Sequence, residues 1–305
     1  MSKKIKIIMI DALKSEYLKY ASYLSSLTKK YQWGELKMPI GHWGGVEIFF
    51  KGESEKLALF HKKEKSSLRW IKKFSWIEKL FGRIAIDVLI NLPRFILGDE
   101  LFRTGKIPIN QLWKFDFCIK KPLYNLKDIE YEYIGDLDEI SHKYGTKSEE
   151  MINAIKRVDE RISKEDFDII FSDHGMIDIK KTISVPISEN CFIDSDMARY
   201  WGNPEELNEI KKKLLMKEGK IINWKDKSYG NLIFIVKPGI LILPNYWQGN
   251  QSVRAMHGYY GNNKEINGIY IIKKQGKKKN LKVEELHNIL TKFKEEKNEK
   301  RDRRE

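Results

Sequence analysis

Residues 168–176, Asp-Ile-Ile-Phe-Ser-Asp-His-Gly-Met, decide the fold that this sequence predicts. A short apolar, β-branched run is typical of a buried parallel strand, and this run ends at Phe171. Asp173, His174 and Gly175 follow the strand almost at once. In open α/β sheets the ligand crevice lies outside the carboxyl ends of the strands. We therefore expect Asp173 and His174 to face a ligand.

The same arrangement occurs at the start of the chain. Residues 4–10 are apolar and β-branched, Asp11 follows them, and a helix is expected over residues 15–31. A strand over 131–134 and a helix over 147–162 come next. Strands that alternate with helices predict an α/β fold with a mostly parallel central sheet and helices on both faces. Four later strands are expected to complete the sheet, over residues 191–193, 232–236, 240–243 and 268–272.

The composition is that of a folded protein with an uneven charge. Its 305 residues are 41% hydrophobic and 12% aromatic, which excludes a disordered chain, a collagen-like repeat and a small disulfide scaffold. The net charge is +14, of which residues 56–83 carry +7 and residues 273–305 carry +6. The remainder is nearly neutral. The basicity therefore belongs to two segments that are separate from the motifs rich in Asp and His.

Two cysteines, Cys118 and Cys191, lie too far apart to suggest a disulfide framework or a cysteine zinc site. The apolar run near the N-terminus is too short for a signal peptide. We expect a cytoplasmic protein, with the membrane surface as a second location. We also expect one hydrolase domain over residues 1–272, interrupted by a basic helical insertion at about 56–125, and a lysine-rich helix and tail over 273–305.

Three of the six histidines lie in short motifs rich in Asp and Gly. The motifs are Asp138-Glu-Ile-Ser-His142, Ser172-Asp-His-Gly-Met176 and Met256-His-Gly-Tyr259. With Asp11 they supply three carboxylates and three imidazoles, which we expect in loops or at strand ends along one edge of the sheet. Such a set suits two divalent ions with three protein ligands each. Two ions about 4 Å apart would clamp and polarise a phosphoryl or sulfuryl oxygen.

Each motif also has a structural explanation. Asp11 after a strand is often a helix N-cap or a turn residue. Asp138 and His142 fit ordinary polar loop positions. The Asp-His-Gly sequence at a strand end is less common, because the glycine allows a tight backbone there. Metal binding is favoured because all the motifs are expected at the same edge.

The order of these motifs resembles the alkaline phosphatase superfamily, in its type I phosphodiesterase/nucleotide pyrophosphatase branch. The resemblance covers roughly residues 4–272, and it is most specific at IIFSDHGM. It extends to YGTKSEE after His142, to CFIDSDMARYW at 191–201 and to FIVKPGILILPNYW before His257. It implies an alkaline-phosphatase-like fold and two metal ions, usually zinc, with manganese and iron as alternatives. It assigns one ion to Asp138, His142 and His257, and the other to Asp11, Asp173 and His174.

The sequence departs from this family at the nucleophile. The family has a Thr or Ser at the start of a helix, a little before a turn that resembles Phe50-Lys-Gly52. Residues 38–52 contain no hydroxyl side chain, and the matching position is His42 or, with a shift of one residue, Trp43. Three hypotheses stay open. His42 attacks phosphorus itself; it acts as a base or an extra ligand while an activated water attacks; or catalysis is lost.

The insertion places Trp70, Phe74, Trp76 and Phe81 among lysines, which is typical of a basic amphipathic helix. Such a helix packs its apolar face on the core as a cap, or it rests on an anionic membrane and presents a lipid-linked phosphate to the metals. Aromatic residues among lysines also suit nucleic acid, but no nucleic-acid-binding motif supports that partner.

These features predict a two-metal hydrolase of phosphate esters, of the phosphodiesterase or phosphatase type. Its substrate is expected to be a small soluble molecule, such as a nucleotide, or a lipid-linked phosphate ester. The alternative is a pseudoenzyme that binds a phosphorylated ligand through the retained metal site.

Overall fold

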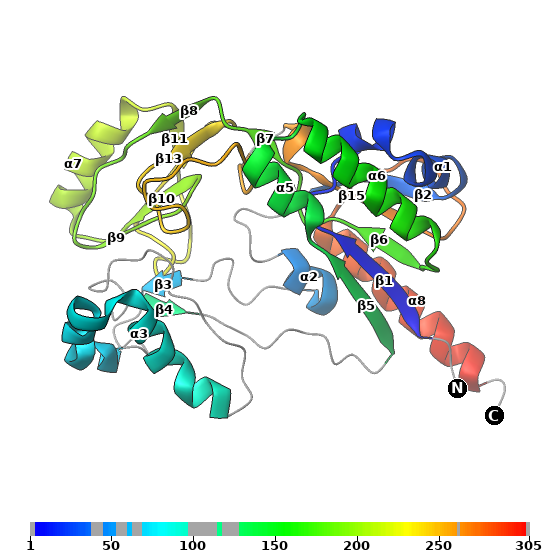
Figure 1. Cartoon of the computed structure of the whole chain (residues 1–305), viewed down its shortest axis with the longest axis horizontal. Helices are drawn as coiled ribbons and strands as arrows, with labels where there is room; N and C mark the ends of the chain where they lie inside the picture. Colours follow the sequence, from blue (N-terminus) through cyan, green and yellow to red (C-terminus); the bar gives the residue numbers. More distant parts are fainter. Residues whose placement is uncertain are drawn as a thin grey trace. The chain divides into compact units, whose positions relative to one another are not determined.

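A computed structural model describes residues 4–37, 45–52, 60–62, 69–96, 115–117, 128–260 and 263–302 (Figure 1). The chain divides into two compact units. The first comprises Met1–Leu57, Pro122–Ile179 and Val253–Glu305, and the second comprises Ala58–Lys121 and Lys180–Ser252. The second unit therefore combines the predicted insertion with a later part of the chain. The domain boundaries expected from the sequence stay predictions.

A six-stranded sheet forms the centre of the first unit. Its strands, in spatial order, are β16 (Leu281–Lys282), β2 (Gln32–Lys37), β15 (Gly268–Ile272), β6 (Ile169–Phe171), β1 (Ile5–Ile10) and β5 (Ile129–Ile134). β1 pairs in parallel with both β5 and β6, and β16 pairs in parallel with β2. Only β15 runs against its neighbours, β2 and β6. The prediction of a mostly parallel α/β sheet is confirmed.

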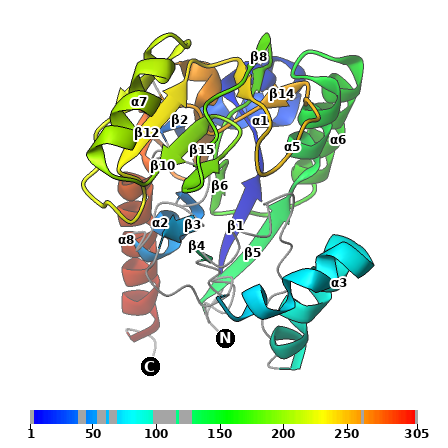
Figure 2. The ribbon, with the colours of Figure 1, turned by 90° about the vertical axis from the view of Figure 1, so that its left-hand side faces the viewer.

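Helices cover both faces of this sheet. The helical elements of the first unit are η1 (Ser15–Tyr20), α1 (Ser22–Lys30), α2 (Gly45–Lys51), α5 (Asp136–Tyr144), α6 (Glu149–Ser163), η3 (Lys264–Ile266) and α8 (Val283–Asp302). Ile8 and Ile10 of β1 belong to a core cluster with residues of α1, α5 and α6. Ile7 and Met9 belong to a second cluster with residues of α2 and α8. Because alternate side chains of a strand point to opposite faces, β1 supplies both cores. Figure 2 shows α2 and α8 on one side of the sheet, and α5 and α6 on the other.

The second unit contains smaller sheets. Its strands are β3 (Phe60–Lys62), β4 (Phe115–Phe117), β8 (Lys181–Ile183), β9 (Cys191–Ile193), β10 (Met197–Tyr200), β11 (Gly219–Ile222), β12 (Leu232–Val236) and β13 (Ile240–Ile242). Strands β11, β12, β10 and β9 form one antiparallel sheet in that order. β13 pairs with β8, and β3 pairs with β4. The helical elements are η2 (Arg69–Phe74), α3 (Ser75–Ile96) and α7 (Pro204–Leu215).

Most of the predicted elements are present, with three corrections. The helix expected over 15–31 is divided at Ala21, where the backbone leaves helical geometry. The strands predicted at 191–193, 232–236 and 240–243 exist, but they pair outside the central sheet. The central sheet instead takes β2, whose sequence QWGELK lacks a clear apolar pattern. Within the described residues, no helix is both long enough and apolar enough to cross a membrane.

Candidate metal centre

Asp11 lies at the carboxyl end of β1, where it is almost fully buried. Its backbone N–H donates to the carbonyl of Ile134, which extends the β1–β5 ladder by one residue. Ala12 follows with φ of 59°, a left-handed conformation that costs energy for a residue other than glycine. The N–H of Leu13 then donates to the Ser172 hydroxyl oxygen at 2.9 Å. The chain thus turns sharply after Asp11 and is tied to the loop that follows β6.

That loop carries Asp173 and His174, and a hydroxyl holds it in place. The Ser172 hydroxyl donates to the carbonyl of His174 at 2.8 Å, while the Ser172 N–H donates to the carbonyl of Ile269 on β15. Nδ1 of His174 lies 3.0 Å from the carbonyl of Gly175. A carbonyl only accepts, so Nδ1 carries a proton, and Nε2 is the ring nitrogen that faces the carboxylates. Nε2 lies 3.2 Å from Oδ1 of Asp11 and 3.5 Å from Oδ2 of Asp173.

Gly175 lets this loop approach the chain ahead of β15. Its N–H donates to the carbonyl of Ile266, and a Cβ at this position would lie 2.2 Å from the carbonyl oxygen of Glu265. Only glycine avoids that overlap with backbone. The tight backbone expected from the Asp-His-Gly sequence is therefore present.

Asp138 and His142 lie on α5, and the expectation that they lie in a loop is wrong. Their spacing of four residues places both side chains on one face of the helix. Nε2 of His142 lies 3.3 Å from Oδ1 of Asp138. Nδ1 of His142 donates to the carbonyl of Ala255 at 2.8 Å, which fixes the ring with Nε2 toward Asp138. A backbone carbonyl that orients the second ring nitrogen is typical of metal-binding histidines.

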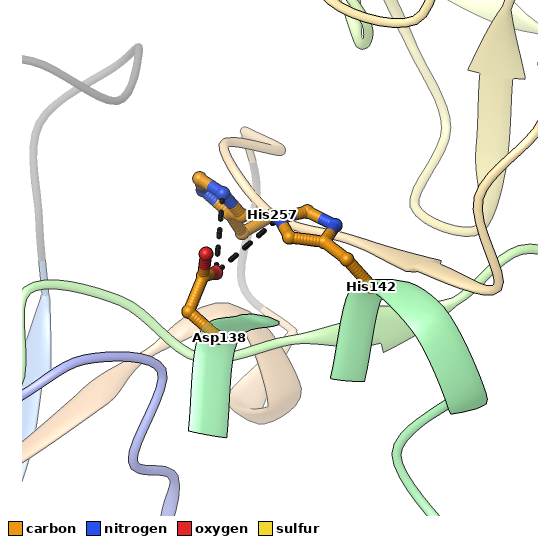
Figure 3. A group of neighbouring side chains, drawn as sticks. All are labelled: Asp138, His142 and His257. Atoms are coloured by element: carbon orange, nitrogen blue, oxygen red, sulfur yellow. Dashed lines mark ion pairs between the residues drawn. The ribbon is translucent and has the colours of Figure 1, made fainter. Parts of the chain in front are cut away.

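His257 is far from α5 in the sequence but lies beside Asp138 in the structure. It directly follows β14 (Ala255–Met256), which pairs with β7 (Ile177–Asp178) just after the Asp173 loop. The His257 Nε2 lies 3.5 Å from Oδ1 of Asp138, so this one oxygen is close to two imidazoles (Figure 3). The His257 ring also stacks on the His174 ring.

The six residues predicted as ligands therefore lie together in the first unit. Two groups have ligand atoms that are all within 4.8 Å of one another: Asp138, His142 and His257, and Asp11, Asp138 and His174. The first matches the predicted set. In the second, Asp138 takes the place expected for Asp173, whose carboxylate lies against Asp11 and His174 instead. Asp138 thus belongs to both groups, which the sequence did not indicate.

The electrostatics of the site penalise the metal-free state. Burial raises the pKa of the Asp173 carboxyl well above its ordinary value, and the nearby carboxylates of Asp11 and Asp138 raise it further. Oδ1 of Asp11 and Oδ1 of Asp173 are buried, and no described residue donates a hydrogen bond to either oxygen. A buried carboxylate in such a cluster is neutralised by a proton or offset by a nearby positive charge, such as a metal ion.

The distances fit divalent ions. Two ligand atoms that bind one tetrahedral zinc at about 2.0–2.1 Å lie about 3.3 Å apart. The observed separations between imidazole Nε2 and carboxylate oxygen, from 3.2 to 3.5 Å, match this value. Three carboxylates and three imidazoles also form the mixed nitrogen and oxygen donor set of zinc, manganese and iron sites. The residues present therefore fit two divalent ions.

Tyr133 is a site residue that sequence reasoning missed. Its hydroxyl donates to Oδ2 of Asp11 at 2.6 Å. Burial, followed by this hydrogen bond and the charge of Asp11, raises the pKa of Tyr133 above its ordinary value. Gly135 gives the phenol room, because a Cβ there would lie 2.8 Å from the Tyr133 oxygen. The only signal in the sequence is the position of Tyr133 on β5, beside the end of β1.

His42 and Trp43 lie outside the described residues. The helix expected to follow the nucleophile is present as α2. Phe49 of this helix packs against Phe171 of β6, with 4.2 Å between the ring centroids. α2 is thus anchored against the strand that leads to Asp173.

No protein-family model matches the sequence, and no curated protein matches it. Solved structures do match its fold. The inactive threonine-to-alanine variant of murine ectonucleotide pyrophosphatase/phosphodiesterase 5, in complex with AMP, matches with a TM-score of 0.64 and 13% identity over 94% of both chains. The human protein of the same name matches with a TM-score of 0.63 and 14% identity, over 95% of this chain and 94% of that chain. The chain therefore shares the fold of these phosphodiesterases.

Proposed function

We propose that this protein is a hydrolase of phosphate esters, of the phosphodiesterase type, that depends on two divalent metal ions. The observation that carries the proposal is the pair of ligand groups that share Asp138. The similarity of fold to the ectonucleotide pyrophosphatase/phosphodiesterases supports it independently. Bound metal ions would act as Lewis acids that polarise the phosphoryl oxygens and offset the charge of the ester.

The chain's own residues prepare this site. His142 and His174 each direct Nε2 inward, because Nδ1 donates to a backbone carbonyl. Tyr133 fixes the orientation of the Asp11 carboxylate by donating to Oδ2, which leaves Oδ1 directed to His174. These hydrogen bonds set the positions of the ligands before an ion binds, so little reorganisation is needed.

The proposed metals are zinc ions, with manganese and iron as alternatives, held by Asp138, His142 and His257 and by Asp11, Asp173 and His174. Asp138 also lies close enough to contribute to the second ion. We assign His42 to the nucleophile position, where it attacks phosphorus, acts as a base, or serves as an extra ligand. The described residues carry no observation that favours the alternative in which the site binds a phosphorylated ligand without hydrolysis.

The proposed substrate is a small phosphate ester, either a nucleotide or a lipid-linked phosphate, and the proposed location is the cytoplasm. AMP in the murine structure supports the nucleotide class. No nucleic-acid partner is proposed.

The experiment is turnover of bis-p-nitrophenyl phosphate by the wild type, by Asp138→Asn and by Asp136→Asn. Both aspartates lie on α5, but only Asp138 belongs to the ligand groups. We expect Asp138→Asn to lower kcat/KM by about 100-fold or more and Asp136→Asn to leave it nearly unchanged. Equal activity of all three proteins would contradict the proposal.

A further inference from the structure

The second unit exposes a continuous set of large apolar side chains on one helix. The set comprises eight residues of α3: Trp76, Leu80, Phe81, Ile84, Val88, Leu92, Phe95 and Ile96. Ile84 is 78% exposed. Soluble proteins rarely leave so many adjacent large apolar residues exposed, and such a patch marks an interaction surface.

The spacing shows that this surface is one face of the helix. α3 bends at Gly82, where φ is 75°, and a second helical segment follows. In that segment Ile84, Val88, Leu92 and Phe95 recur at three or four residues, which places them in one stripe. Ile86 and Ile90 are buried, and their positions fall on the opposite side of the helix. The helix therefore packs through one apolar face and presents a second apolar face to solvent.

Most of the large apolar residues of this segment are not buried, as a cap helix would bury them. Ile77 is half-buried, whereas other large apolar residues are exposed: Trp70, Phe74, Trp76, Leu80, Phe81 and Ile84. Ile71 is buried and anchors η2. η2 and α3 therefore form an amphipathic structure in which Ile71, Ile86 and Ile90 are buried and most other large apolar side chains are exposed.

Charge indicates the partner of this surface. Arg69, Lys72 and Lys73 on η2 and Lys79 on α3 are exposed beside the apolar residues. The whole segment from residue 56 to 83 holds nine basic and two acidic residues. A second copy of the chain would bring these like charges together, which disfavours self-association. Anionic lipid headgroups would neutralise them, while the apolar stripe enters the boundary of the acyl chains.

We propose that η2 and α3 form a docking surface for an anionic lipid bilayer. The helix lies along the bilayer rather than across it, since α3 contains Pro93 and charged residues and does not meet the requirements of a membrane-spanning helix. Trp70 and Trp76 have the amphipathic rings that favour the interface between headgroups and acyl chains. This surface does not involve the metal ligands, so its role does not depend on the proposed hydrolase activity.

The test is co-sedimentation of the full-length protein with phosphatidylcholine vesicles that contain or lack phosphatidylglycerol. The variants are Ile84→Glu and Phe95→Glu in the stripe, with Ile187→Glu as the matched control. Ile187 is 67% exposed, belongs to the same unit and lies outside η2 and α3. Circular dichroism establishes that each variant is folded.

We expect binding to the vesicles that contain phosphatidylglycerol, a loss of about tenfold or more with Ile84→Glu or Phe95→Glu, and no loss with Ile187→Glu. Lys72→Glu with Lys73→Glu should weaken binding to anionic vesicles more than tenfold, since each lost basic residue costs about fivefold. Absence of binding, equal binding to neutral vesicles, or equal effects of Ile84→Glu and Ile187→Glu would overturn the proposal. A concentration-dependent dimer that Ile84→Glu abolishes would also overturn it, because a second copy would then be the partner.

Discussion

The imidazole rings of His174 and His257 are stacked, with 3.6 Å between their centroids and 7° between their planes. The two histidines belong to different ligand groups, so the stack brings the two groups into contact. Two protonated imidazoles would repel each other at this distance, whereas neutral rings stack without that penalty. Neutral imidazoles are also the form that binds metal ions. The stack therefore places the two candidate ligand groups next to each other.

We predict that His257→Ala and Asp138→Asn have different effects on metal content. His257 belongs to one ligand group and Asp138 to both. His257→Ala should lower the bound metal from about two ions per chain to about one. Asp138→Asn should lower the affinity for both ions. Metal analysis of the dialysed variants measures this, and identical losses in the two variants would contradict the sharing of Asp138.

Removal of the metals should make the repulsion among the carboxylates measurable as a loss of stability. The raised pKa of Asp173 shows that its charged form destabilises the metal-free folded state. Asp173→Asn should therefore raise the Tm of the chelator-treated protein by about 2 °C or more, while it lowers the Tm of the metal-loaded protein. Thermal unfolding with and without chelator tests this reversal. A decrease of Tm in both states would contradict it.

The raised pKa of Asp173 also predicts the direction in which stability changes with pH. Below the raised pKa of Asp173 the folded protein holds a proton that the unfolded chain releases, so stability increases as the pH falls. This gain ends near pH 4, where the carboxyl of the unfolded chain is protonated as well. The Asp173 carboxyl should therefore make the free energy of unfolding of the metal-free wild type increase on mild acidification, relative to that of Asp173→Asn. Urea unfolding of both proteins at several pH values measures the difference, and a constant difference would contradict the account.

Tyr133→Phe should weaken metal binding without unfolding the protein. The substitution removes only the hydroxyl that donates to Asp11, and the ring is half exposed. Loss of such an orienting hydrogen bond typically costs 10- to 100-fold in metal affinity. The matched control is Tyr144→Phe on the exposed side of α5. Competition with a chromophoric chelator gives the affinities, and equal values for the two variants would show that Tyr133 does not position Asp11.

Gly175→Ala should destabilise the protein more than Gly202→Ala. A Cβ on Gly175 would overlap the backbone oxygens of Glu265 and Asn267, which are unable to move independently. A Cβ on Gly202 would meet only the end of the flexible Glu206 side chain. We expect a loss of about 1–3 kcal/mol in the free energy of unfolding for Gly175→Ala. Equal stability of the two variants would contradict the close approach of the Asp173 loop to the chain ahead of β15.

The sequence predicted the central strands well because their apolar runs end in distinctive residues. β1 and β6 are followed by Asp11 and by Ser172-Asp-His, and the scarcity of histidine made the ligand motifs visible. β2 was missed because its sequence, QWGELK, lacks a clear apolar pattern. The strands β9 and β12 were predicted, but periodicity within one strand contains no information on which strand it pairs with.

Within the site, the sequence predicted which six residues lie together but not their arrangement. Asp138 and His142 were placed in a loop, because α5 has only nine residues and its N-cap residue, Gly135, has no side chain that could cap the helix. The sharing of Asp138 and the hydrogen bond from Tyr133 depend on how α5 and β5 lie beside β1, which no local pattern encodes.

Reconstitution of the chelator-treated protein with zinc or manganese, monitored by turnover of bis-p-nitrophenyl phosphate, tests the central claim most directly. We predict that chelation abolishes hydrolysis and that activity returns as about two equivalents of metal bind. Hydrolysis that survives complete chelation, or binding of two equivalents without any hydrolysis of diesters or monoesters, would contradict a two-metal phosphoesterase.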